Sequence, residues 1–298
     1  MLRFFECPGA SDHAYLSIRD RPEQAEVRRI VEEEWDVAAP FLDPDLPARA
    51  AHEFTAHYWE VYLAAALLRV GLPLIPRKAR RRPREGPDLQ VAAPPTWIEA
   101  VVTKPGTGLD AVAEPQPASL AAVPHDAMKL RFINAITFKW RKRSDYVRSG
   151  DIREEDSYVV AINSAPIFLA MLEREVPRIV SSVYPIGSKV LHIDRQSGRQ
   201  VGSSFEYQPV VTKLAGASVP TDIFLRQEFA GVSALIHAHS DAFNRPTRPG
   251  EEFIVVHNKL AAHPIAHGSL PCSREYRADE TQVDEIVYDW PWHGAGGC

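Results

Sequence analysis

Four acidic residues in the stretch 53–102 stand where segments of secondary structure are expected to end or turn. Glu53 and Glu60 are seven positions apart in an amphipathic run, so they lie on nearly the same face of a helix, two turns apart. Asp88 follows Gly-Pro at the start of a short strand, and Glu99 lies inside Trp-Ile-Glu-Ala-Val. Carboxylates on adjacent strands, beside a helix that carries a third, can bind a hard cation. The leading hypothesis is therefore a site for Mg²⁺ or Mn²⁺.

A basic run lies immediately before Asp88. It places six cations in eight residues, namely Arg77, Lys78, Arg80, Arg81, Arg82 and Arg84. A run of this kind is usually a solvated loop. The whole chain has 298 residues and a net charge of −5, so any binding of a polyanion must depend on a local cluster such as this one. The position of the run favours a loop that contacts phosphate groups.

The elements that must position these residues can be predicted from periodicity and breakers. A helix is expected from about Ala48 to Val70, stopped by Gly71 in the left-handed conformation. Strand alternation places Glu99 on the same face as Trp97 and Val101. The predicted order after the helix is a strand at Leu72–Pro76, a hairpin of Asp88–Val91 and Thr96–Val102, a helix at Asp126–Arg148, and a buried strand at Tyr158–Asn163.

The chain is expected to form a single α/β domain, with residues 1–47 as a helical extension and 164–298 as a β-rich elaboration. In residues 164–298 we expect a helix from about Ile167 to Val183, interrupted near Pro177, and a polar tail after Gly268 that ends in a disordered tip. The strands predicted there are Val190–Asp194, Phe205–Val211, Val232–His237 and Phe253–His257.

The order of a Glu-bearing helix, Pro87-Asp88, Glu99 eleven residues later, a basic helix and a buried strand resembles the PD-(D/E)XK nuclease superfamily. The similar part covers about residues 48–163. The resemblance implies a restriction-endonuclease-like core, α-β-β-β-α-β, here with additional C-terminal strands. It also implies metal-dependent hydrolysis of phosphodiester bonds in nucleic acid, DNA in preference to RNA.

The resemblance assigns roles to individual residues. Asp88 and Glu99 stand at the two acidic metal ligands, and the carbonyl of Ala100 would complete the site. Glu60, or with less support Glu53, stands at the helix Glu that binds metal directly or through water. A metal-bound water would attack the phosphodiester while the cation neutralises the charge that develops on the phosphoryl oxygens.

One position departs from the family pattern. The family's Lys belongs two residues after the second acid, and Val101 stands there instead. Lys104 precedes a proline and is expected to leave this face of the strand. Lys139, on the following helix, is better placed to act as the catalytic lysine, and Arg131, two turns earlier, could bind a phosphate.

Two alternatives stay open. Because of Val101, the chain could be a catalytically inactive protein of this fold that binds nucleic acid or a protein partner. A different class would be a small-molecule metallohydrolase that uses His237 and His239, which strand alternation places on one side.

The overall composition of the chain indicates its broad class and compartment but not its function. Apolar residues make up 45% and charged residues 24% of the chain, as in ordinary globular proteins. Three widely spaced cysteines and no recognisable signal peptide predict a cytoplasmic protein. No run is long enough to span a bilayer, so no membrane partner is expected. A homodimer remains an option that the sequence does not decide.

Overall fold

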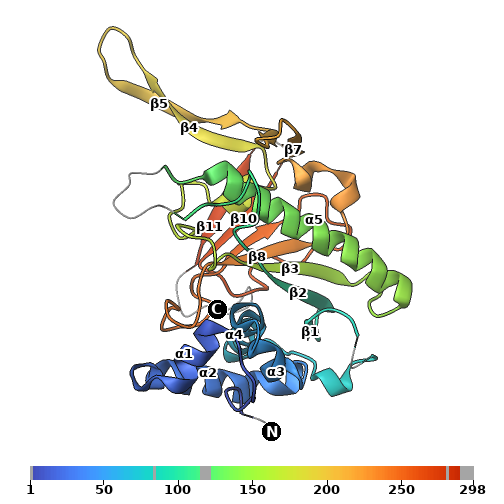
Figure 1. Cartoon of the computed structure of the whole chain (residues 1–298). Helices are drawn as coiled ribbons and strands as arrows, with labels where there is room; N and C mark the ends of the chain where they lie inside the picture. The colour runs from blue at the N-terminus through green and yellow to red at the C-terminus, as the bar shows by residue number, and fades with distance from the viewer. Residues whose placement is uncertain (1–2, 83–84, 115–121, 280–281, 289–298) are drawn as a thin grey trace.

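The computed structural model describes residues 3–82, 85–114, 122–279 and 282–288. Its centre is a seven-stranded mixed sheet with the order β1-β2-β3-β8-β9-β10-β11, which confirms the α/β class (Figure 1). These strands are β1 (Leu89–Val91), β2 (Thr96–Val102), β3 (Ser157–Asn163), β8 (Ala234–Ala238), β9 (Ile254–His257), β10 (Arg274–Ala278) and β11 (Val283–Val287).

Strand direction changes across the sheet. The central strands β2, β3 and β8 run parallel, whereas β1 and β9 are antiparallel to their neighbours β2 and β8. Strand β10 is parallel to β9, and β11 is antiparallel to β10. Every residue of β3 is buried, which confirms the prediction of a fully buried strand at Tyr158–Asn163.

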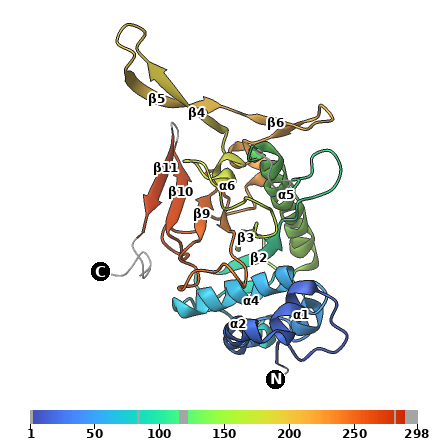
Figure 2. The same ribbon diagram turned by 60° about the vertical axis from the view of Figure 1, so that its left-hand side comes forward.

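The helices of the N-terminal part of the chain cover one face of the sheet (Figure 2). They are α1 (His13–Asp20), α2 (Ala25–Ala38), α3 (Leu46–Ala50) and α4 (Phe54–Arg69). The Ala-rich and aromatic α4 lies against the sheet, and the Trp59 indole N–H donates to the carbonyl of Ala161 in β3 at 3.0 Å. Asp12 accepts from a backbone N–H group in the first turn of both α1 and α4, at Tyr15 and Phe54.

The long helix α5 (His125–Ser149) covers the opposite face of the sheet. Its apolar residues Phe132, Ile133 and Ile136 pack with Val160 and Ile162 of β3. The chain leaves α5 at Gly150, whose φ of +76° is the left-handed conformation expected of a C-terminal glycine. Because α5 connects β2 to the parallel strand β3, it is the crossover that holds these two strands side by side.

A buried acid joins the N-terminal helices to the C-terminal half. Glu34, on α2, is fully buried, accepts from the Tyr58 hydroxyl at 2.9 Å, and is ion-paired with Arg69 and Arg245. Arg245 follows β8, so the contact spans most of the chain. The N-terminal helices thus share one core with the sheet.

Three predicted elements were wrong. Leu72–Pro76 is not a strand, and its pairing is limited to a single bridge between Leu74 and Val91. The helix expected at 167–183 is reduced to α6 (Arg178–Ser181), because the Arg178 guanidinium donates to the carbonyls of Ala170 and Leu172 and holds the preceding segment as a loop. The stretch after Gly268 forms β10 and β11, while the predicted disordered tip lies outside the described residues.

Four further strands lie outside the main sheet. Strands β4 (Ile186–Ile193) and β5 (Gln200–Tyr207) form an antiparallel ribbon that projects from the body (Figure 1), and β6 (Val210–Thr212) pairs with β7 (Ser218–Pro220). We call the ribbon 186–207 the arm. None of the helices in the described ranges is long and apolar enough to cross a membrane.

Candidate active site

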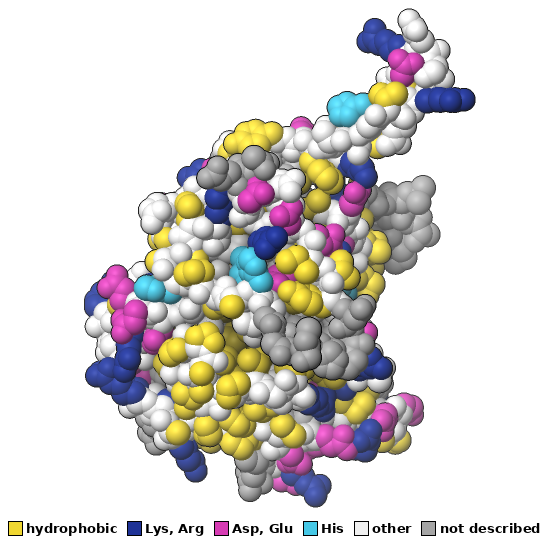
Figure 3. All heavy atoms as spheres, turned by 180° about the vertical axis from the view of Figure 1, so that it is seen from behind, with side chains coloured by type: hydrophobic (Ala, Val, Ile, Leu, Met, Phe, Trp, Pro, Cys, Tyr) yellow, Lys and Arg dark blue, Asp and Glu magenta, His cyan; other side chains and the backbone are white. Residues whose placement is uncertain are grey.

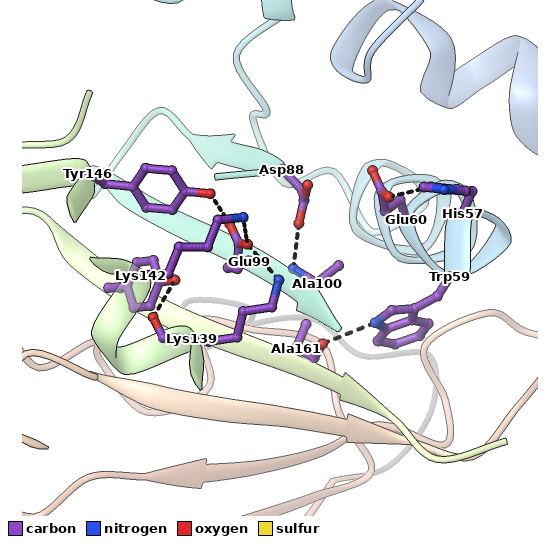
Figure 4. A network of polar contacts seen from close by, with 11 residues as sticks. His57, Trp59, Glu60, Asp88, Glu99, Ala100, Lys139, Lys142, Tyr146 and Ala161 are labelled. Carbon is purple, nitrogen blue, oxygen red and sulfur yellow. Dashed lines mark hydrogen bonds and ion pairs between the residues drawn. The ribbon is translucent and has the colours of Figure 1, made fainter. Parts of the chain in front are cut away.

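The β1–β2 hairpin brings Asp88 and Glu99 together, as the spacing predicted. Leu89 pairs with Ile98, so the register one step earlier sets Asp88 opposite Glu99. Asp88 Oδ2 accepts from the backbone N–H of Ala100 at 2.7 Å, which turns its carboxylate toward β2 (Figure 4). The two acids therefore face one small region at the start of β1.

Glu99 is held by three side chains of α5. Its Oε1 accepts from Lys139 Nζ at 2.6 Å and from Lys142 Nζ at 2.7 Å, and its Oε2 accepts from the Tyr146 hydroxyl at 3.1 Å (Figure 4). The Glu99 side chain is only 1% exposed. An ionised carboxylate at such depth needs partners of this kind, because an unpaired buried charge is strongly unfavourable.

Helical geometry explains how α5 presents these groups. Lys142 and Tyr146 follow Lys139 by three and seven positions, which places all three on one face of the helix. The carbonyl of Lys139 accepts from the Tyr158 hydroxyl of β3 at 3.2 Å, so the helix is fixed to the sheet at this turn. Lys139 was predicted from the sequence, whereas Lys142 and Tyr146 were not, although their spacing from Lys139 indicates that they share its helix face.

Burial and the neighbouring charged groups both shift the pKa of Asp88. Burial raises the pKa of Asp88 well above its usual range, and the nearby charges of Glu99 and Glu60 raise the pKa further, while Lys139 opposes them. The raised pKa of Asp88 thus comes first from desolvation and second from the two neighbouring carboxylates. Such an environment favours either a proton or an added cation.

Glu60 lies on the α4 side of Asp88, away from Glu99 (Figure 4). Its carboxylate is 2.9 Å from His57 Nδ1 on the same helix, and its side chain is 13% exposed. Glu53, the weaker candidate, is exposed and ion-paired with Lys104 at 2.5 Å. Lys104 thus leaves the Glu99 face, as expected.

The fit of a metal ion to this centre can be judged from the donors present. In the described part of the chain, no group of three or more His, Cys, Asp or Glu side chains is placed to hold a metal. The donor set does fit a hard cation in kind, because it consists of carboxylates in a negative environment. The Lys142 ammonium is ion-paired with Glu99, and its side chain is 40% exposed, so it can turn toward solvent.

The basic loop differs from the prediction at its buried members. Arg77 is ion-paired with Asp43 at 2.6 Å, and Arg80 donates to three backbone carbonyls, those of Phe41, Pro87 and Asp88. Burial lowers the pKa of Arg80 to about 10. The prediction that Arg77 and Arg80 contact phosphate was wrong, because both guanidinium groups are used to fold the loop.

The remaining cations of the loop are less constrained. Arg82 is exposed, but it is ion-paired with Glu85 and Asp151. Its guanidinium is therefore only partly available for contact with a phosphate group. Lys78 and Arg81 are exposed, and Arg84 lies outside the described residues. Arg81 lines a cavity of about 230 Å³ beside the hairpin.

Arg131 packs against the loop that follows β2. A Cβ on Gly106 would lie 1.9 Å from an Arg131 terminal nitrogen, and Gly106 has a φ of +83°, so this close approach requires glycine. Arg131 Nε is buried without a hydrogen-bond partner, and no ion pair to Arg131 is found among the described side chains.

His237 and His239 do not form a metal centre with other side chains of the described ranges. His237 is fully buried in β8, its Nε2 lies 3.0 Å from Ser164 Oγ, and its ring contacts Phe132. Burial lowers the pKa of His237 well below its usual range. Strand β8 is buried along its whole length, so His237 lies in the core.

A cavity of about 880 Å³ lies elsewhere, between α2 and the loop after β8, and its lining includes none of Asp88, Glu99 or Lys139. The chemistry-bearing residues and this large opening are thus separate features. Comparison of the chain with protein-family models, with curated proteins and with solved structures gave no match.

Proposed function

We propose that this chain is a metal-dependent, nuclease-like hydrolase of phosphodiester bonds in nucleic acid, DNA in preference to RNA. The proposed restriction-endonuclease-like core consists of α4, β1, β2, α5 and β3, one strand fewer than the α-β-β-β-α-β order, because the segment 72–76 contributes only a single bridge. The observation that carries the proposal is the convergence of Asp88 and Glu99 with Lys139 in one partly buried centre. Burial and the neighbouring carboxylates disfavour the ionised form of Asp88, and acidic groups perturbed in this way are typical of functional sites.

In this proposal Asp88, Glu99 and the Ala100 carbonyl would hold Mg²⁺ or Mn²⁺, with Glu60 supporting through water. The bound cation would supply Lewis-acid stabilisation of the phosphoryl oxygens. Lys139, whose ammonium is already hydrogen-bonded to Glu99, would hold and orient the attacking water. Lys142 would leave Glu99, because its exposed side chain can reach solvent. Arg131, with Lys78 and Arg81, would contact backbone phosphates.

A specific observation favours a second candidate. Both oxygens of Glu99 have partners, two lysines on one and a tyrosine on the other, and Val101 replaces the family's lysine. A carboxylate neutralised in this way has no need of a metal ion. The second candidate is therefore a catalytically inactive protein of the same fold that binds nucleic acid or a protein partner.

Calorimetric titration with Mn²⁺ and Mg²⁺ separates the two candidates. For the hydrolase, the wild-type chain binds metal, Asp88→Asn abolishes binding, and Glu53→Gln, which changes an exposed acid paired with Lys104, retains it. Metal-dependent cleavage of a mixed DNA and RNA panel should be lost in Glu99→Gln. Equal heat in wild type and Asp88→Asn would remove the Asp88 site. Nucleic-acid binding with neither metal binding nor cleavage would establish the inactive candidate.

A further inference from the structure

The arm is separated from the main sheet and stands away from the body of the molecule (Figures 1 and 3). Strands β4 and β5 pair only with each other in the described structure, in a two-stranded sheet whose central pair is Leu191 and Ser203. With eight residues in each strand, the arm is about 26 Å long. An isolated ribbon of two strands is at best marginally stable in water.

The residues of the arm alternate between apolar and polar along each strand. Alternation places one set of large apolar side chains on a single face, which we call the apolar arm face: Leu191, Ile193, Val201, Phe205 and Tyr207. The other face carries Val190 and otherwise small or polar residues, including a His192–Ser204 pair at 2.9 Å, and Lys189 at the base lies on the apolar side opposite Phe205. This is the pattern of strands that bury one face against a partner layer.

No such layer is present in the described chain. The five side chains of the apolar arm face are between 43% and 71% exposed. Large side chains have about 150–250 Å² of surface each, so the five expose roughly 500 Å² of apolar area in one patch. Single exposed apolar residues are ordinary, but a contiguous patch of this size marks an interaction surface.

We propose that the apolar arm face is the interface with a second copy of this chain. Two identical faces stacked about a two-fold axis would bury on the order of 1,000 Å², the lower range for a specific contact. The stacked arms would run in opposite directions, so the tip of each would meet the base of the other. The base carries charges of both signs, because Glu175 is ion-paired with Lys189 of the same chain at 2.7 Å, so the apolar area alone would hold the two arms together.

The geometry makes Ser203 the residue to test, because it lies at the middle of the arm on the apolar side and would meet its own copy near the axis. Its neighbour Ser204 points to the opposite face and is a matched control. In a Cys298→Ser background, Ser203→Cys should form a disulfide-linked dimer on mild oxidation, and Ser204→Cys should not. Equal cross-linking of the two variants, or of neither, would overturn the proposed packing.

Sedimentation of the full chain from about 1 to about 200 µM provides the second measurement. The wild type should dimerise, and Leu191→Lys should weaken the dimer about 30-fold or more, because it places a charge in the centre of the contact. Ser204→Lys adds the same charge to the polar face and should leave the dimer intact. Circular dichroism and the thermal midpoint confirm that each variant is folded. A wild type that stays monomeric throughout the range, with or without nucleic acid, would refute the proposal.

Discussion

The Lys142 ammonium lies 2.7 Å from Glu99 Oε1, the same oxygen that Lys139 contacts at 2.6 Å. The two lysines differ in burial, because the Lys142 side chain is 40% exposed and that of Lys139 only 10%. One carboxylate thus has a fixed cation and an exchangeable cation. The difference allows their roles to be separated by substitution.

Lys142→Ala should change the free energy of unfolding by less than about 1 kcal/mol, because an exposed ammonium is screened by water. If the metal hypothesis is right, the same substitution should tighten Mn²⁺ binding, since it removes the competing charge from Glu99. Urea unfolding and calorimetry measure the two effects. Weaker metal binding in Lys142→Ala would contradict the view that this ammonium occupies the place of a cation.

Lys139→Ala should destabilise the protein by about 3 kcal/mol, because it removes the buried partner of a buried carboxylate. The double variant Lys139→Ala, Glu99→Gln should recover part of this loss, since the amide no longer carries an unpaired charge. Urea unfolding of the two single variants and the double variant completes the cycle. Additive losses would show that the two side chains are not coupled.

The pH dependence of the stability of Asp88→Asn tests whether ionisation of Asp88 destabilises the folded protein. The folded-state pKa of Asp88 is raised above the unfolded value near 3.8, so its contribution to stability is present below that value and is lost as pH rises through the folded pKa. Asparagine keeps an acceptor for the Ala100 N–H but cannot ionise. The variant should be about 1 kcal/mol more stable than wild type near neutral pH, and the difference should vanish toward pH 4.

The measurement is the unfolding free energy of both proteins from pH 4 to pH 8. Glu53→Gln, which changes an exposed acid, should show no comparable trend. If the unfolding free energies of Asp88→Asn and wild type differ by the same amount at all pH values, ionisation of Asp88 is not the cause of the difference in stability.

Arg80 and Arg81 are neighbours in the basic loop with opposite expected effects. Arg80→Ala should cost about 3 kcal/mol of stability, because the buried guanidinium donates to three carbonyls. Arg81→Ala should leave stability within about 0.5 kcal/mol. If the chain binds nucleic acid, Arg81→Ala should reduce the salt dependence of binding by about one charge. A destabilised Arg81→Ala would show that this side chain also folds the loop.

The hairpin and the placement of Lys139 could be predicted from the sequence because both depend on local spacing. A two-strand register fixes Asp88 opposite Glu99, and a helix of known phase carries Lys139 toward the same face. The use of Arg77 and Arg80 could not be predicted. Their partners, Asp43 and the Phe41 carbonyl, lie more than thirty positions earlier in the chain, and nothing in the basic run indicates them.

The same limit explains the errors in the C-terminal half. The apolar pattern at 167–183 fits a helix, but Arg178 binds the carbonyls of Ala170 and Leu172 and stabilises a loop instead. The polar residues of β10 and β11 form strands because β9 offers its edge to β10. In each case tertiary contacts decided between local alternatives of similar energy.

The Glu34–Arg245 contact has a consequence for how the chain can be shortened. A truncated protein beginning at residue 48 would keep Glu60, Asp88, Glu99 and Lys139, and would look complete if only those side chains were considered. It would lose Glu34, leaving Arg69 and Arg245 to repel each other beneath an uncovered Tyr58. Fragments that omit the first two helices should therefore aggregate or unfold, and the smallest useful expression product retains them.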